Sequence, residues 1–332
     1  MARVTHLRSA LALAPPWLRW GVKLVLSAVL LGFVLRTIEP GRFLGAMAAI
    51  DPVWFAGAVV LFFPGKLLDA YRWHVVLRRL AQPLPYWTIV RYSFVGQVSA
   101  LVLPGQISGD VVRVMAVVRG REGKLAFAVS AVIDKLALLI ATLVFVLTGI
   151  FGTAGIATLY PVYLMALALM LVVVPVFIAL GRFRTWPSGW RIGRGALWEL
   201  VGQSLQRLGM LPRLSVGSLC MILGLGVGVQ ALYVLGSYCI AHAMQITIGL
   251  LDWATINAIV ALVQLVPITI GGLGVREGVL VVLLHRYGVS SAQTIAYSLT
   301  GFAASVVLTI ASWLLSEALA DRMTEVSRPP SA

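Results

Sequence analysis

The residues of this sequence that could do chemistry are charged side chains set inside strongly apolar stretches. In two stretches, LPGQISGDVVR and VPITIGGLGVREG, a proline is followed by glycines and then by charged residues. These residues are Pro104, Gly109, Asp110 and Arg113 in the first stretch, and Pro267, Gly271, Gly272, Gly274, Arg276 and Glu277 in the second. Proline removes a helical hydrogen bond and glycine lets the backbone turn, so each stretch should contain a broken helix. The half-helix after each break would present free N–H groups, which favour a phosphate or a carboxylate.

Two further apolar segments carry charges. The segment FFPGKLLDAYRW places Lys66, Asp69 and Arg72 three residues apart, on one side of a helix. The segment AVIDKLALL carries Asp134 and Lys135. Because ionisable groups inside a membrane are unfavourable unless they are paired or hydrated, we expect Asp134 to face a polar cavity. Lys66 and Arg72 could instead extend along their helix to the cytoplasmic interface.

The candidate cavity residues have an excess of one positive charge. The cations are Lys66, Arg72, Arg113, Lys135 and Arg276, and the carboxylates are Asp69, Asp110, Asp134 and Glu277. Such an excess suits an anionic ligand group. Alternatively, Asp110 with Arg113 and Arg276 with Glu277 are mutual pairs that only hold the broken helices, because buried pairs often specify structure without touching a ligand.

No recognisable catalytic or metal-binding motif occurs in the sequence. The four histidines are scattered, without carboxylates or cysteines at metal-ligand spacing. Neither a Gly-x-Ser-x-Gly motif nor a P-loop is present, and GLGVRE lacks the preceding strand that a dinucleotide-binding site needs. We therefore expect no enzyme activity, no cofactor and no metal.

The elements that must position these residues are membrane-spanning helices. Of the 332 residues, 60% are hydrophobic and only 11% are charged, and the mean hydropathy is +0.96, far above that of a soluble domain. The apolar runs are continuous, which favours helices over the alternating strands of a membrane β-barrel. The net charge of +14 comes from basic residues in short loops, which indicates topology signals and not nucleic-acid binding.

Six apolar runs are long enough to cross the bilayer. They are residues 21–37, 53–77, 126–150, 157–180, 215–242 and 292–316. We expect the first run to be a retained helix, because small residues that could form a signal-peptide cleavage site follow it only after several charges.

The charge of the loops predicts the orientation of these helices. The loops at both ends of 86–118 are basic and belong in the cytoplasm, whereas residues 151–156 and 243–251 carry no charge and belong outside. The stretch 86–118 must then enter and return as a re-entrant hairpin, and 252–286 must do so from the opposite side. The prediction is an all-α polytopic membrane protein with six full crossings, two broken re-entrant helical hairpins and both termini in the cytoplasm.

The two hairpins also predict an internal duplication. Aligning Pro104 on Pro267 aligns Gly109 on Gly272 and Arg113 on Arg276. We expect one integral membrane domain built as an inverted repeat, with broken helices at the binding site. Its parts are residues 1–150 as first repeat, 151–318 as second repeat, an insert at 182–213 and a tail at 319–332. The insert reads as a cytoplasmic amphipathic helix or as a simple polar loop.

The motifs LPGQISGDVVR, IDK at 133–135 and VPITIGGLGVREG resemble those of the lysylphosphatidylglycerol synthase transmembrane (flippase-like) family. The resemblance covers nearly the whole chain. It implies a bacterial inner-membrane protein that binds or flips lipids, related to the membrane half of phospholipid aminoacyl-transferases and to proteins of hopanoid or glycolipid pathways. Ser108 and Lys135 stand where the family commonly has Gly and Arg. No soluble domain follows the membrane part, so we do not expect the synthase activity.

Together these observations predict a lipid translocase or a lipid-binding transporter. An anionic or phosphate-bearing lipid would place its headgroup in the cavity between the hairpins, so the expected partners are membrane lipids. Three alternatives remain open: a secondary transporter of a small anion, a membrane enzyme that acts on a lipid phosphate, and a scaffold for pathway enzymes. The resemblance implies that such a scaffold would be a membrane component of a hopanoid or glycolipid pathway.

Overall fold

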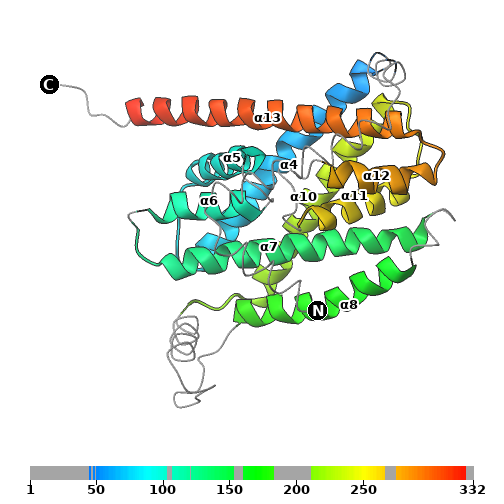
Figure 1. Ribbon diagram of the computed structural model, residues 1–332. Coiled ribbons are helices and arrows are strands. Elements are labelled where there is room, and N and C mark those ends of the chain that lie inside the picture. The colour runs from blue at the N-terminus through cyan, green and yellow to red at the C-terminus, as the bar shows by residue number, and fades with distance from the viewer. Residues whose placement is uncertain are drawn as a thin grey trace, which may run out of the picture.

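The structure, a computed structural model, describes residues 50–102, 107–119, 121–152, 160–182, 211–265 and 274–326, together with residues 45 and 48. Over these residues the chain is helical and has no strand (Figure 1). The all-helical class expected from composition is therefore confirmed for the described part of the chain.

Five helices are long and apolar enough to span a membrane. They are α4 (Pro52–Arg79), α7 (Lys124–Leu147, continued by the 3₁₀ turn η1, Thr148–Phe151), α8 (Tyr160–Arg182), α10 (Val216–Ala243) and α13 (Ser291–Val326). Each coincides with a predicted crossing. The remaining predicted crossing, 21–37, and the interior of the insert, 183–210, lie outside the described residues. Helix α13 continues to residue 326, so it includes the first part of the segment 319–332 that we had assigned to the tail.

Each interrupted stretch contains two short helices. The first pair is α5 (Tyr86–Val102) and α6 (Ile107–Val118), and the second is α11 (Leu250–Gln264) and α12 (Val275–His285). Both breaks coincide with the proline and glycine motifs. Pro104, Pro267, Gly271 and Gly272 themselves lie outside the described residues.

Local sequence explains where α4 begins and ends. The Asp51 side chain accepts a hydrogen bond from the backbone N–H of Val53 at 2.8 Å, and Pro52 occupies the first helical position. Both are favourable at a helix N-terminus. Arg78 and Arg79 lie in the last turn, where cations complement the negative end of the helix dipole.

The centre of the molecule is the contact of α4 with α10. Around it, α5 packs on α13 and α6, while α11 packs on α7 and α12. Figure 1 shows α5 and α6 toward the end of the molecule where α7 begins, and α11 and α12 toward the opposite end. The two broken pairs therefore approach the centre from opposite ends.

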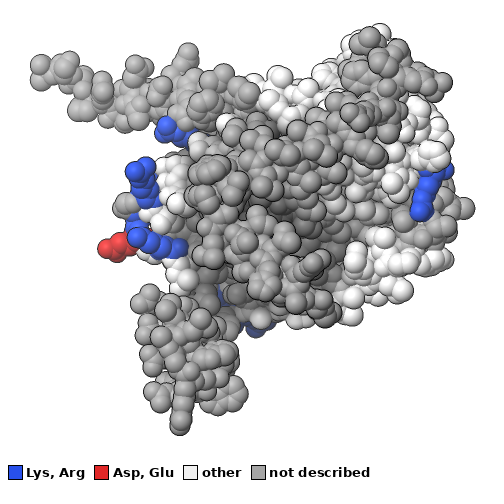
Figure 2. Space-filling view, viewed as in Figure 1, with Lys and Arg blue, Asp and Glu red and all other residues white. Residues whose placement is uncertain are grey.

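Basic residues gather at one end of the molecule. Figure 2 shows most of the visible Lys and Arg side chains on the left, the end where α6 finishes and α7 begins. Exposed basic residues include Arg119 after α6 and Lys124 at the start of α7, and Arg78 and Arg79 at the end of α4. Helix α13 also ends on this side (Figure 1).

Candidate functional site

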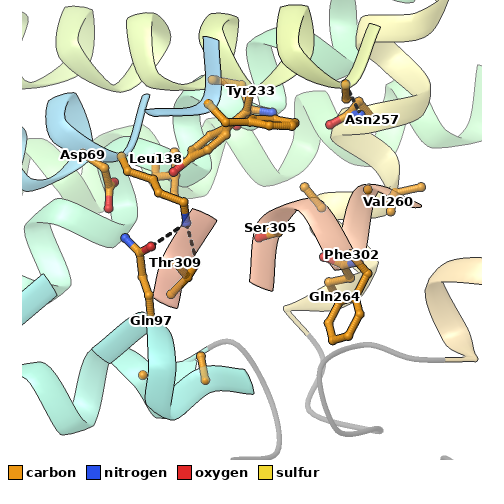
Figure 3. A pocket seen from close by; sticks show the side chains of 18 of the residues that line it. Asp69, Gln97, Leu138, Tyr233, Asn257, Val260, Gln264, Phe302, Ser305 and Thr309 are labelled. Atoms are coloured by element: carbon orange, nitrogen blue, oxygen red, sulfur yellow. Dashed lines mark hydrogen bonds between the residues drawn. The ribbon is translucent and has the colours of Figure 1, made fainter. Parts of the chain in front are cut away.

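A cavity of about 480 Å³ lies where the broken helices meet the long helices. Residues of α4 to α7 and of α10 to α13 line it, and Figure 3 shows several of them from close by. Its volume falls within the range of small-molecule binding sites, about 300–1,000 Å³. The predicted site residues in its wall are Lys66, Asp69, Gly109, Asp110, Arg113, Lys135 and Arg276.

Six of the predicted residues form one chain of alternating charges across α4, α6 and α7. From α4 to α7, its members in order are Asp69, Arg72, Asp134, Arg113, Asp110 and Lys135. The successive N···O distances are 2.7, 2.7, 2.7, 3.1 and 2.7 Å. Three cations face three carboxylates, so the chain has no net formal charge.

Asp134 is the centre of this chain and is fully buried. Its Oδ1 accepts from Arg72 Nε, and its Oδ2 accepts from Arg113 Nη2, both at 2.7 Å. Although we expected Asp134 to face the cavity, the structure places it behind the wall, between two guanidinium groups. Arg72, only 1% exposed, does not extend to the membrane interface.

Arg113 links helix α6 to its neighbours α4 and α7. Besides its bonds to Asp134 and Asp110, its guanidinium carbon lies 4.4 Å from the centroid of the Trp73 ring. The Trp73 Nε1–H donates to Ser130 Oγ on α7 at 3.0 Å, which fixes the ring. Such a cation–π contact adds to the ion pairs when it is withdrawn from water.

Arg276 and Glu277 form a second, smaller cluster at the start of α12. Glu277 is fully buried; its Oε2 accepts from the Gly274 N–H at 2.6 Å, and its Oε1 accepts from Arg276 Nη2 and Ser298 Oγ, both at 2.7 Å. Gly274 has φ +87°, a conformation that favours glycine. The cluster thus caps α12 and ties it to α13 through Ser298. Glu277 and Gly274 do not line the cavity, whereas Arg276 does.

Lys66 is the cation left without a carboxylate. Lys66 is 6% exposed, and its Nζ donates to Gln97 Oε1 at 2.6 Å and to Thr309 Oγ1 at 2.8 Å; the dashed lines that reach Gln97 and Thr309 in Figure 3 mark these two bonds. None of the carboxylates that the structure describes lies within 4 Å of it. Since Glu277 balances Arg276 and the alternating chain balances itself, the excess positive charge of the site is located at Lys66.

Several residues of the cavity wall were not singled out from the sequence. They include Gln97, Gln230, Tyr233, Asn257 and Thr309. The sequence could have indicated three of them as cavity residues, because Gln97, Gln230 and Asn257 are isolated amide side chains in apolar helices. Thr309 and Tyr233 gave no such signal, since Thr and Tyr are common in membrane helices without a ligand role.

Gly109 allows α5 and α6 to approach at backbone distance. A Cβ atom added there would lie 2.4 Å from the Gly96 carbonyl oxygen and 2.9 Å from Ala100 Cβ. We expect Gly109→Ala to reduce the free energy of unfolding by about 1–3 kcal/mol, as overpacking does. Thermal unfolding of the purified protein in detergent measures the effect. Gly278→Ala in α12 is the control, because no atom lies within 4 Å of its added Cβ; equal melting temperatures for the two variants would contradict the close approach.

Comparison with known proteins identifies a family that this chain matches. Residues 20–312 match the profile of the family described as "Lysylphosphatidylglycerol synthase TM region". A UPF0104 membrane protein of Methanothermobacter thermautotrophicus is 25% identical in an alignment 328 positions long, and the alignment covers 89% of this chain and 92% of that protein. The family match spans all ten described helical elements except the end of α13.

Proposed function

Since this chain belongs to the lysylphosphatidylglycerol synthase TM-region family of membrane proteins, we propose that it translocates a lipid with an anionic, phosphate-bearing headgroup. The headgroup enters the cavity between the two broken helix pairs while the acyl chains stay in the bilayer. The protein leaves the lipid covalently unchanged.

The observation that carries this proposal is the buried ammonium group of Lys66. A buried charge is unfavourable unless it is paired, and among the residues that the structure describes the hydrogen-bond partners of the Lys66 ammonium are the neutral Gln97 and Thr309. The group lies in the wall of a cavity that a headgroup could occupy. An anion bound there would supply the missing counter-charge and would form charge-assisted hydrogen bonds with the ammonium.

We propose that the cavity opens alternately to the two sides of the membrane through relative movement of two related halves of the chain. The proposed architecture has six crossings and two re-entrant hairpins, with the second half inverted relative to the first. The helix contacts support it: exchanging α4 with α10, α5 with α11 and α7 with α13 turns the α5–α13 contact into the α11–α7 contact, and both occur. In inverted-repeat transporters, binding sites lie between such halves and rocking of the halves exposes them in turn.

The basic end of the molecule is proposed to face the cytoplasm, across the inner membrane, with both termini on that side. The exposed arginines at that end support this orientation. Cysteine labelling from each side of the membrane measures it: with Cys220 and Cys239 replaced, Arg121→Cys should react from the cytoplasm and Gln245→Cys from outside. The reverse pattern would overturn the orientation.

Reconstitution into vesicles tests the proposed function. Fluorescent phosphatidylglycerol, phosphatidylinositol and phosphatidylcholine are placed in the inner leaflet, and their arrival in the outer leaflet is followed by chemical quenching. We expect the protein to accelerate transfer of anionic lipids, which chromatography recovers unchanged. Acceleration of inorganic phosphate uptake without lipid transfer would contradict the proposal and favour a small-anion transporter.

A further inference from the structure

The two walls of the cavity differ in chemistry. The wall built by α4, α6 and α7 carries charged side chains, namely Lys66, Asp69, Asp110, Arg113 and Lys135. The wall built by α10, α11 and α13 carries amide and hydroxyl groups, and none of its described residues has an ionised side chain. Its polar residues include Gln230, Tyr233, Asn257, Ser298 and Ser305. Arg276 of α12 is the one described cation on that side, and Glu277 neutralises it.

Polar groups of the uncharged wall are available to a ligand. Tyr233 lines the cavity and is half-buried, with its ring centroid 6.1 Å from that of Phe62 on α4. Asn257 donates from Nδ2 to Ser237 Oγ at 2.7 Å, which leaves its carbonyl oxygen as an acceptor. Ser305 also lines the cavity. In Figure 3 Tyr233 lies near Asp69 and Leu138, whereas Asn257 lies farther along the pocket, away from Gln97 and Thr309, the two hydrogen-bond partners of Lys66.

The chemical difference is most evident between corresponding helices of the proposed repeat. Helix α4 places the ammonium of Lys66 in the cavity, whereas α10 places the amide of Gln230 there. The Gln230 side-chain oxygen accepts a long hydrogen bond of 3.5 Å from Thr142 Oγ1, and the residue lines the cavity. A ligand that spans the cavity therefore contacts the Lys66 ammonium at one end. At the other end it contacts side chains that offer both hydrogen-bond donors and hydrogen-bond acceptors.

Hydroxyl groups are the ligand groups that suit such a wall. A hydroxyl both donates and accepts, so it can satisfy an amide oxygen and a phenolic hydroxyl at the same time. A second cation in the ligand would meet Arg276 and would find no carboxylate without a partner of its own among the described wall residues. The volume of about 480 Å³ is also larger than a bare phosphate requires.

We infer that the headgroup has two parts: a phosphate that binds beside Lys66, and a neutral polyhydroxyl group that binds the amides and hydroxyls of α10, α11 and α13. The inference rests on the proposed function, because the same cavity holds the headgroup. It identifies the ligand as a lipid whose phosphate carries a polyol or a sugar. The wall then discriminates by leaving its polar groups unpaired when a ligand lacks hydroxyls.

Binding of matched lipids to the purified full-length chain tests the two-part site. The probes are phosphatidylinositol, phosphatidic acid, phosphatidylcholine and monogalactosyldiacylglycerol with the same acyl chains, and soluble glycerol 3-phosphate. Native mass spectrometry with titration gives the dissociation constants. We expect phosphatidylinositol to bind about tenfold tighter than each of the others, since two good hydrogen bonds are worth about that factor.

Two variants separate the two parts of the site. Lys66→Gln should weaken phosphatidylinositol and phosphatidic acid but not the galactolipid. Asn257→Ala combined with Ser305→Ala should weaken phosphatidylinositol and the galactolipid by about tenfold but not phosphatidic acid. The matched controls are Lys124→Gln and Gln245→Ala, both exposed and outside the cavity wall. If the double variant does not fold, Ser305→Ala alone is measured, and we expect it to weaken the binding of phosphatidylinositol and of the galactolipid by less than about tenfold.

The outcomes distinguish this inference from the proposed function. Equal affinity for phosphatidic acid and phosphatidylinositol, unchanged by the Asn257 and Ser305 substitutions, would overturn the two-part headgroup and leave lipid translocation standing. Binding of glycerol 3-phosphate with no binding of any lipid would overturn the proposed function itself.

Discussion

Lys66→Gln is expected to slow the translocation of anionic lipid by about ten- to a hundredfold. The substitution removes the excess cation of the site and with it a charge-assisted hydrogen bond, worth about 1.5–3 kcal/mol. Glutamine keeps a long polar side chain that can still bond to Gln97 and Thr309, so the helix packing should persist. Vesicle transfer rates of the variant and of the unmodified chain, at equal protein content, give the comparison.

Two further variants make this result specific. Lys124→Gln removes an exposed charge at the start of α7 and should leave the rate unchanged. Lys66→Met should lose transport and also raise the melting temperature of the lipid-free protein, because it removes a buried charge whose hydrogen-bond partners among the described residues are neutral. Full transport by both Lys66 variants would place the anion elsewhere and refute the assignment of the excess charge.

Asp134→Asn is expected to destabilise the protein by about 3–5 kcal/mol, the range for breaking a buried ion pair. The carboxylate accepts from two buried guanidinium groups, those of Arg72 and Arg113. A neutral amide would leave an uncompensated cation and would turn an NH₂ group toward one of the two arginines. Thermal unfolding in detergent, with and without added lipid, measures the loss.

The surrounding chain offers both a control and a rescue. Asp69→Asn removes a carboxylate that is 17% exposed and pairs only with Arg72 among the described residues, so its effect should be clearly smaller. Arg72→Met combined with Asp134→Leu removes one cation with the carboxylate and should recover much of the stability, while Asp110 still pairs with Arg113. An Asp134→Asn protein that melts normally but transports nothing would show that this carboxylate acts on the ligand, as its sequence position alone had led us to expect.

The sequence by itself determined the membrane-spanning elements and the places where helices break. The run from 53 to 77 and the motifs at Pro104 and Pro267 needed no knowledge of neighbours, because run length, backbone donors and backbone freedom are local properties. Composition also established that the candidate residues carry one more cation than carboxylate. A count of charges is independent of how the side chains pair.

Only the tertiary structure decided which cation is in excess and which carboxylate is shared. Lys66 bonds to residues 31 and 243 positions away, and Asp134 joins arginines 62 and 21 positions away. Helical periodicity relates residues within a turn or two and cannot select among five cations that are spread over four helices. That selection came from the packing of α4, α5, α6, α7 and α13, which buried Asp134 between two guanidinium groups and left the ammonium of Lys66 in the wall of the cavity.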